Sequence, residues 1–324
     1  MMRRTLLGAA ALLPLSMTIA AARAAAFRDV LDTPAAPSPL AARGLLNGLA
    51  RAGRRLVAVG QRGHVLASDD AGKTWLQADA VPVSTDLVAL HFPTPERGWA
   101  VGHDGVILAS SDGGRRWTRQ FDGRRLGERG AENPLLDVWF DDANHGLAVG
   151  AFGTLLRTGD GGATWSSAAD AADNPKGLHL YAVRRVGGAL FIAGEQGLLL
   201  RHDGARFAAV ATPYAGTLFG VLGNERALLA HGLRGNVVRS ADGGRSWQAV
   251  ATKLGVGLTG SALDERGRFI LASQAGHVLV SSDDGASFVP LTIARPQPAA
   301  AVASAGNGTL VLAGPRGLQT LTLP

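Results

Sequence analysis

An eight-residue pattern recurs along the chain and limits its possible folds more than any other feature of the sequence. In its clearest copy, residues 240–247, a serine stands first, an aspartate third, a glycine fifth, a hydroxyl residue seventh and a tryptophan last. We call each copy a corner, because its composition is that of a tight turn between two strands. The other copies are residues 68–75, 110–117, 158–165 and 281–288, with a shortened, degenerate copy at 201–207.

The chemistry of these residue types predicts a turn that closes itself. An aspartate in a tight turn accepts hydrogen bonds from backbone N–H groups that follow it, and the glycine allows a positive φ. The tryptophan enters an apolar layer, where it covers roughly 150–250 Å². The pattern resembles the Asp-box of bacterial neuraminidase repeats. The predicted structural residues are Asp70, Trp75, Asp112, Trp117, Asp160, Trp165, Asp242, Trp247, Asp283 and Phe288.

A second series runs in phase with the corners and gives the number of repeats. Each copy is an apolar run, a glycine-containing tight turn and a second apolar run, as in a β-hairpin. The turn glycines are spaced 38 to 48 residues apart, which is the length of a four-stranded propeller blade. We therefore predict an all-β fold, a seven-bladed β-propeller. The turn glycines are Gly63, Gly105, Gly153, Gly197, Gly235, Gly276 and Gly317.

The two ends of the repeated region predict how the ring closes. The last unit ends after its third strand, residues 318–323, with no corner and no fourth strand. Residues 27–32 precede the first unit and have no other evident place. We expect them to form the outer strand of the seventh blade, because this would pair an otherwise open edge.

The bulk composition excludes several classes of function. The 324 residues contain 32 Lys and Arg against 26 Asp and Glu, and no long basic run, so we expect no nucleic-acid partner. There is no cysteine, which excludes disulfides and thiolate metal sites. No pattern of metal ligands or of cofactor binding was found, and we expect neither a metal nor a cofactor.

The first residues resemble an export signal. Arg3 and Arg4 are followed by an apolar stretch and then by small residues at 22–26. We therefore assign residues 1–26 to a signal peptide and residues 27–324 to the propeller. The expected location of the protein is the periplasm, as a soluble monomer.

Candidate catalytic residues are few. A sialidase-like glycosidase needs a tyrosine nucleophile and acidic partners, and the chain has only Tyr181 and Tyr214. Tyr181 falls in a predicted inner strand and Tyr214 in a loop. We expect no enzymatic activity, and keep a carbohydrate-active enzyme or lectin as the alternative.

Three arginines share one position near the end of the third strand of neighbouring blades: Arg157, Arg201 and Arg239. In one interpretation they form a ladder of guanidinium groups for carboxylates on a partner. In the other, each packs its stem over a corner tryptophan and pairs with a local carboxylate. The sequence leaves both open.

The face that carries the glycine turns is the second candidate surface. It has Arg62 and Arg234 at turn tips, and Arg124 and Arg125 in the longest insertion between blades. Phe152 stands among polar neighbours there, either to anchor a partner or to pack against the insertion.

Taken together, these motifs resemble the photosystem II stability/assembly factor family over residues 27–324. The most specific match is Gly153, Arg157 and Thr158 running into Asp160, Gly161, Gly162 and Trp165. The resemblance implies a seven-bladed propeller that assists photosynthesis as a non-enzymatic assembly factor. It also implies a membrane-protein partner, bound through an arginine-rich patch to which Arg157, Arg201 and Arg239 correspond. The partner would be a photosystem-like assembly or an exporter.

Overall fold

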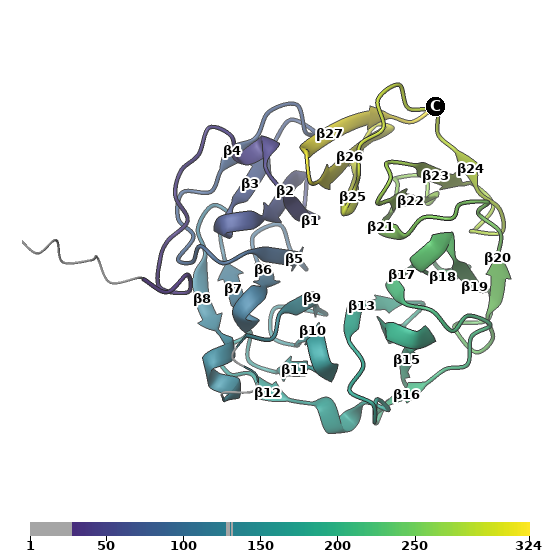
Figure 1. Cartoon of the computed structure of the whole chain (residues 1–324), viewed down its shortest axis with the longest axis horizontal. Helices are drawn as coiled ribbons and strands as arrows, with labels where there is room; N and C mark the ends of the chain where they lie inside the picture. The colour runs from purple at the N-terminus through teal and green to yellow at the C-terminus, as the bar shows by residue number, and fades with distance from the viewer. Residues whose placement is uncertain (1–27, 128–129, 131) are drawn as a thin grey trace, which may run out of the picture.

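The computed structural model describes residues 28–127, 130 and 132–324, which form seven antiparallel sheets arranged in a ring (Figure 1). Six sheets have four strands and the last has three. The predicted all-β, seven-bladed β-propeller is therefore confirmed. The predicted signal peptide lies outside the described residues. Within them, no helix is long and apolar enough to cross a membrane.

Each blade runs from the centre of the ring outward in chain order, with its first strand innermost (Figure 1). The first three blades are β1 (Leu46–Ala52), β2 (Arg55–Gly60), β3 (Val65–Ser68), β4 (Leu76–Gln77); β5 (Leu87–His91), β6 (Gly98–Gly102), β7 (Ile107–Ser110), β8 (Thr118–Phe121); and β9 (Leu135–Phe140), β10 (Gly146–Gly150), β11 (Leu155–Thr158), β12 (Ser166–Ser167). The next two are β13 (Leu180–Val186), β14 (Ala189–Gly194), β15 (Leu199–His202), β16 (Phe207–Ala209); and β17 (Leu218–Gly223), β18 (Leu228–Gly232), β19 (Val237–Ser240), β20 (Gln248–Val250). The last two are β21 (Leu258–Leu263), β22 (Phe269–Ser273), β23 (Val278–Ser281), β24 (Val289–Pro290); and β25 (Ala301–Gly306), β26 (Thr309–Gly314), β27 (Gly317–Thr322).

The corners close as their sequence predicts. At Asp242, one carboxylate oxygen accepts hydrogen bonds from the backbone N–H groups of Arg245 and Ser246, both at 3.0 Å. The other oxygen accepts the Ser246 hydroxyl at 2.6 Å. Gly244 has φ 82°, and its carbonyl accepts the Trp247 indole N–H at 3.3 Å. The hydrogen bonds that close this turn thus join residues at most four apart.

Each complete corner also joins its blade to the preceding one. A Cβ on Gly244 would lie 2.4 Å from the ring of Phe191 in the blade before it, so the backbone is pressed directly onto that ring. Trp247 packs edge-to-face on the same ring, with the centroids 6.1 Å apart. The corner therefore works as a wedge between blades, and its aromatic residue belongs to the interface.

The same device closes the ring, and the prediction for residues 27–32 is wrong. Residue 27 lies outside the described residues, and 28–32 do not pair with β27. Instead, Val30 accepts a hydrogen bond from the Ser84 N–H at 2.8 Å. The seventh blade keeps three strands, and its side is covered by the first corner. A Cβ on Gly72 would lie 2.6 Å from Val311, and the Thr320 hydroxyl donates to the Gly72 carbonyl at 3.3 Å.

The N-terminal segment has a different part in closure. In the other six blades, the turn between the second and third strands packs on the backbone connection that leads to the next blade. At the seventh blade, Gly317 packs on Ala42 and Arg43 of the short helix η1 (Ala41–Arg43), where a Cβ would lie 2.2 Å from the Ala42 carbonyl oxygen. Residues before β1 thus stand in for the missing connection from blade seven to blade one.

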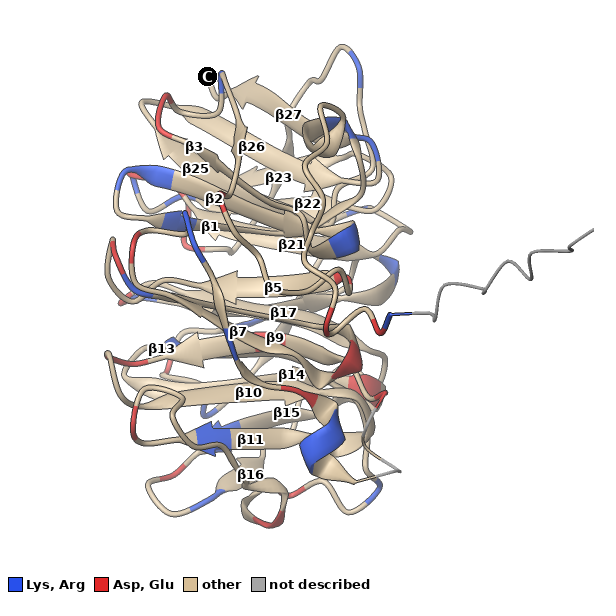
Figure 2. Cartoon of the chain, turned by 90° about the vertical axis from the view of Figure 1, so that its left-hand side faces the viewer, with Lys and Arg blue, Asp and Glu red and all other residues tan. Residues whose placement is uncertain are grey.

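Charge is concentrated at the turns. Seen from the side, the strands are mostly free of charged residues, and Lys, Arg, Asp and Glu lie mainly at the two faces of the disc (Figure 2). The interior of the blades is apolar because both sides of each sheet pack on a neighbour. Any site for a charged partner must therefore lie on a face, at an interface between blades or in the central channel.

Candidate partner-binding surfaces

The first surface is the face formed by the turns between second and third strands. Five of these turns are short helices whose middle residue has φ between 53° and 57°, a strained conformation for a residue other than glycine. The middle residues of three of these turns, Arg62, Phe152 and Arg234, are exposed on this face. The five turns are η2 (Gln61–Gly63), η3 (His103–Gly105), η5 (Ala151–Gly153), η7 (Glu195–Gly197) and η8 (Leu233–Gly235).

An aromatic row leads from this face towards the centre. Phe152 is 66% exposed and packs edge-to-face on His179, with the centroids 4.8 Å apart. His179 lies 6.4 Å from Tyr181, and Tyr181 packs edge-to-face on Phe219 at 5.3 Å. The aromatic partner of Phe152 is therefore His179 of the next blade. The exposed ring of Phe152 is thus the outer end of an aromatic row whose inner members, Tyr181 and Phe219, line the central channel.

The two arginines of the insertion, in η4 (Gly123–Leu126), have different environments. Arg124 donates to Asp32 at 3.0 Å and to Asp122 at 3.2 Å. The hydrogen bonds from Arg124 and Arg119 lower the pKa of Asp32 to about 2. Arg124 thus ties the N-terminal segment to the insertion. Arg125 is exposed, with its guanidinium 5.9 Å from the centroid of the Phe121 ring.

The three strand arginines share a register but not an environment. Each is the third residue of its strand and lies at the end opposite to the turn face. Arg239 donates to the backbone carbonyl of Asp284, in the corner of the next blade, at 2.7 Å. Arg201 is half-buried, and Arg157 is exposed. Within the described part of the chain, none of the three makes an ion pair with a carboxylate.

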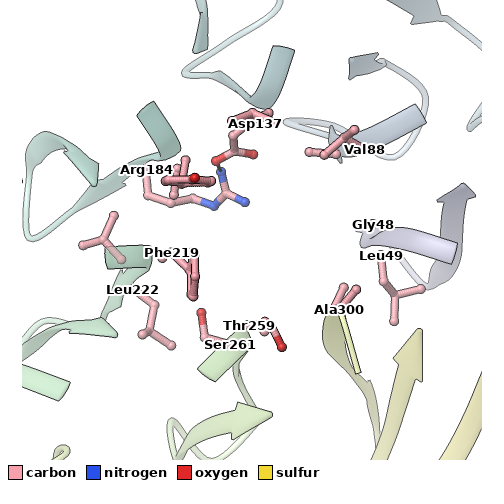
Figure 3. Close-up of a pocket in the computed structure, with 18 of the residues that line it drawn as sticks. Gly48, Leu49, Val88, Asp137, Arg184, Phe219, Leu222, Thr259, Ser261 and Ala300 are labelled. Carbon is pink, nitrogen blue, oxygen red and sulfur yellow. Dashed lines mark hydrogen bonds and ion pairs between the residues drawn. The ribbon is translucent and has the colours of Figure 1, made fainter. Parts of the chain in front are cut away.

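The central channel contains an ion pair between a buried carboxylate and a half-buried arginine, which the sequence did not predict (Figure 3). The channel has a volume of about 590 Å³ and is lined by the innermost strands of the blades. Asp137 of β9, 4% exposed, accepts hydrogen bonds from Arg184 of β13 and from the Val183 N–H, the latter at 2.8 Å. Burial raises the pKa of Asp137, and the charge of Arg184 opposes this rise. The pair therefore links blades three and four.

The channel offers little catalytic chemistry. Glycoside hydrolysis requires two carboxyl groups on either side of the scissile bond, and Asp137 is the one carboxylate among the described residues that line the channel. Burial raises the pKa of Tyr181, which disfavours a phenolate nucleophile. The Tyr214 hydroxyl is bonded to the Leu233 carbonyl at 3.0 Å. The described residues contain no cluster of three metal-ligating side chains.

Comparison with known proteins gives a family match. The model of the family described as photosynthesis system II assembly factor YCF48 matches residues 21–111 and 125–290. A search of curated proteins gives no match.

Several solved structures share the fold. A structure of YCF48 bound to D1 peptide is 16% identical, covers 87% of this chain and 94% of its own, and has a TM-score of 0.69. YCF48 from Cyanidioschyzon merolae is 18% identical over 89% of this chain and 98% of its own, with a TM-score of 0.64. A GH74 enzyme of Niastella koreensis is 14% identical over 86% of this chain and 52% of its own, with a TM-score of 0.65. At these identities, each likeness concerns the fold.

Proposed function

The chain belongs to the family of photosynthesis system II assembly factor YCF48, and from this membership we propose that it is a non-enzymatic assembly factor. It binds a membrane protein and helps a membrane complex to assemble or to remain stable. The observation that carries the proposal is the family match, which spans most of the blades. The solved structure of a family member with a bound D1 peptide supports a peptide segment as the form in which the partner is recognised.

The proposal extends to location. Residues 1–26 act as an export signal, and the mature chain works in the periplasm as a monomer. The partner is then a membrane protein that exposes a segment on that side of the membrane. An exporter or a photosystem-like complex meets this requirement.

The surfaces available for this role are those with exposed cations. On the turn face, Arg62 of blade one, Arg234 of blade five and Phe152, where the aromatic row starts, are exposed. At the opposite end of the strands, Arg157 is exposed. Arg124 and Arg239 are less suited to contact a partner, because their guanidinium groups already hold the fold together.

Crosslinking in native membranes tests the role. The full chain, tagged at its C-terminus, is crosslinked in cells of its source, and the captured proteins are identified by mass spectrometry. We expect one membrane protein to be enriched over a tagged, exported control propeller. Recovery should fall in a turn-face variant with Arg62→Glu and Arg234→Glu, in an Arg157→Glu variant, or in both. Capture of no membrane protein above the control would refute the role.

The fold gives no specific support to the carbohydrate-active alternative. The likeness to a GH74 enzyme is at 14% identity, and the described channel lining lacks a carboxylate pair. Assay of the purified chain against sialosides and a panel of aryl glycosides should show no turnover. Sustained turnover would contradict the non-enzymatic proposal.

A further inference from the structure

Within the described residues, two interfaces between blades lack the glycine wedge, because the corner of blade four is degenerate and blade seven has no corner. Between blades six and seven, Ile270 of β22 is nonetheless fully buried, in a cluster with Leu310 and Leu323. The interface between blades three and four is the one left unfilled.

The complete corners of blades one, two, three, five and six each place their glycine against the preceding blade. In blade six, a Cβ on Gly285 would lie 2.6 Å from Leu229 of blade five. Both Leu229 and its counterpart Phe191 in blade four, which Gly244 covers, are fully buried as a result.

The corner of blade four is the degenerate copy, and it cannot make this contact. From the strand arginine to the aromatic residue it has two residues fewer than the corner of blade three, and it lacks both hydroxyl residues. Asp203 still closes a small turn by accepting the N–H groups of Ala205 and Arg206 at 2.9 Å. Phe207 is buried. No glycine wedge reaches blade three.

The consequence is a groove between blades three and four. Leu147 pairs with Arg157 across the strands, as Phe191 pairs with Arg201 and Leu229 with Arg239. Leu147 thus occupies the position that a corner covers elsewhere, yet it is only half-buried. The groove has a volume of about 240 Å³. Its apolar side chains are Trp139, Leu147, Ala168, Ala171, Leu190, Ala205 and Phe207.

The same loss leaves Arg157 unengaged. Its counterpart Arg239 donates to the backbone of the next corner at 2.7 Å, whereas the degenerate corner offers Arg157 no such acceptor. Arg157 lines the groove and is exposed, and its guanidinium makes no hydrogen bond or ion pair with any described residue. Arg157 is therefore a cation beside an apolar groove, and its guanidinium makes no bond that stabilises the fold.

The other polar groups of the groove do not cancel this charge. Asp141 accepts hydrogen bonds from Arg185 at 2.7 Å and from the Trp139 indole at 2.7 Å. His145 is bonded to Asp142 at 2.8 Å. His202 lies against Phe207 with the ring centroids 4.8 Å apart. A ligand that enters the groove thus meets an apolar floor and one uncompensated positive charge.

We propose that this groove is the anchor point for an acidic, extended segment of a partner protein, and that it takes one apolar side chain while Arg157 binds a neighbouring carboxylate. The inference rests on the proposed function, and it adds the place and the chemistry of recognition. A volume of about 240 Å³ is below the range of roughly 300–1,000 Å³ for small-molecule pockets, which favours a single side chain. Charge complementarity favours an acidic segment.

Peptide titration tests the site directly. The probe is Ac-Gly-Glu-Phe-Glu-Gly-amide, followed by methyl NMR of the full chain. We expect shifts of the Leu147 and Leu190 methyl groups, and at least tenfold weaker binding after Arg157→Gln. A peptide with Gly in place of Phe should bind at least tenfold more weakly. Arg245→Gln, at an exposed position in the corner of blade five, is the matched control and should leave binding unchanged.

Restoring the wedge provides the second arm. Residues 202–207 are replaced by Thr-Gly-Asp-Gly-Gly-Ala-Thr-Trp, the corner of blade three, which should fill the groove and abolish peptide binding. Ala171→Trp fills it without an insertion and should have the same effect. Both variants are used only if their circular dichroism and melting show a folded propeller, which we expect because each adds packing. Equal affinity in a folded variant, or shifts that map elsewhere, would overturn the groove.

The two proposals fail separately. If the native chain captures a membrane protein in cells and the filled-groove variants capture it equally well, the groove inference falls and the assembly role stands. If the native chain captures none, the role falls, while the peptide titration still decides whether the groove binds an acidic apolar segment.

Discussion

Replacing Arg184 by methionine takes away the counter-charge of a buried carboxylate in the central channel. Asp137 is 4% exposed, and its described partners are Arg184 and the Val183 N–H. Methionine keeps much of the volume of the arginine stem, which lies with its guanidinium 5.8 Å from the Trp139 ring. The substitution therefore removes charge with little loss of packing.

The cost follows from the burial of Asp137. Removing one partner of a buried pair destabilises by about 3–5 kcal/mol, because the remaining charge is left uncompensated. Burial already raises the pKa of Asp137 above 3.8, and loss of Arg184 raises it further. A carboxyl whose pKa is higher in the folded than in the unfolded state stabilises below the unfolded pKa and loses this contribution as pH rises. The variant should therefore lose about 3–5 kcal/mol at pH 7.5 and less at pH 5.

Urea unfolding at pH 7.5 and pH 5, followed by tryptophan fluorescence, measures this effect. Arg185→Met is the control, since Arg185 pairs with the more exposed Asp141 and an exposed pair contributes about 0–1 kcal/mol. The control should show no comparable change between the two pH values. An Arg184→Met variant that is destabilised equally at both would refute the argument that an unpaired, buried Asp137 causes the loss.

Three further predictions concern the corners and the N-terminal segment. Hydrogen bonds from Thr74 lower the pKa of Asp70 from 3.8 to about 2. The stability that Asp70 gives its corner is therefore present above pH 4 and falls as the pH drops towards 2. Acid titration followed by circular dichroism measures this loss. Trp117→Ala should cost about 3–5 kcal/mol in urea unfolding, because Trp117 is 3% exposed, and Trp165→Ala, at a half-buried site, should cost less. Arg124→Ala should speed amide hydrogen exchange in residues 29–35 with little change in global stability.

The parts of the fold that sequence predicted are those held by local contacts. The hydrogen bonds of the corner aspartate and of the first hydroxyl residue join residues at most four apart, so eight residues suffice to identify a corner. The apolar run at residues 135–140 forms β9 over its whole length. The run that begins at Leu178 forms a strand only from Leu180, because Asn174 makes two hydrogen bonds with the backbone of Leu178 and holds it in a loop.

The parts that sequence did not predict depend on distant neighbours. Edge pairing suggested a strand of residues 27–32 beside β27, but Val30 pairs with Ser84 in the connection between blades one and two. Nothing local to those residues distinguishes the two partners. The ion pair of Asp137 had a signal, a carboxylate within an apolar inner strand. Its significance depends on Arg184 in the next blade.

The strand arginines show the same limit for the candidate site. Arg157 and Arg239 are equivalent in the repeat, yet one is exposed at a groove and the other is bonded to the next corner. The difference is set one blade further along, by the presence or loss of a corner. Sequence therefore predicts which positions carry arginine, and the packing of the following blade decides which arginine is available.

The absence of a corner contact between blades three and four lowers the stability of that interface, and this loss is informative about the function of the groove. Stability in repeat architectures is approximately a sum over repeats and their nearest-neighbour interfaces, so the loss at one of them is tolerated by the others. The interface between blades three and four retains a buried Phe207 and the Asp137–Arg184 pair, which hold the blades together without the corner. Grafting a complete corner there should therefore raise stability. Stabilising substitutions of this kind cost function where a site depends on unfilled structure, so a graft that stabilises the propeller and removes peptide binding would identify the groove as a functional feature.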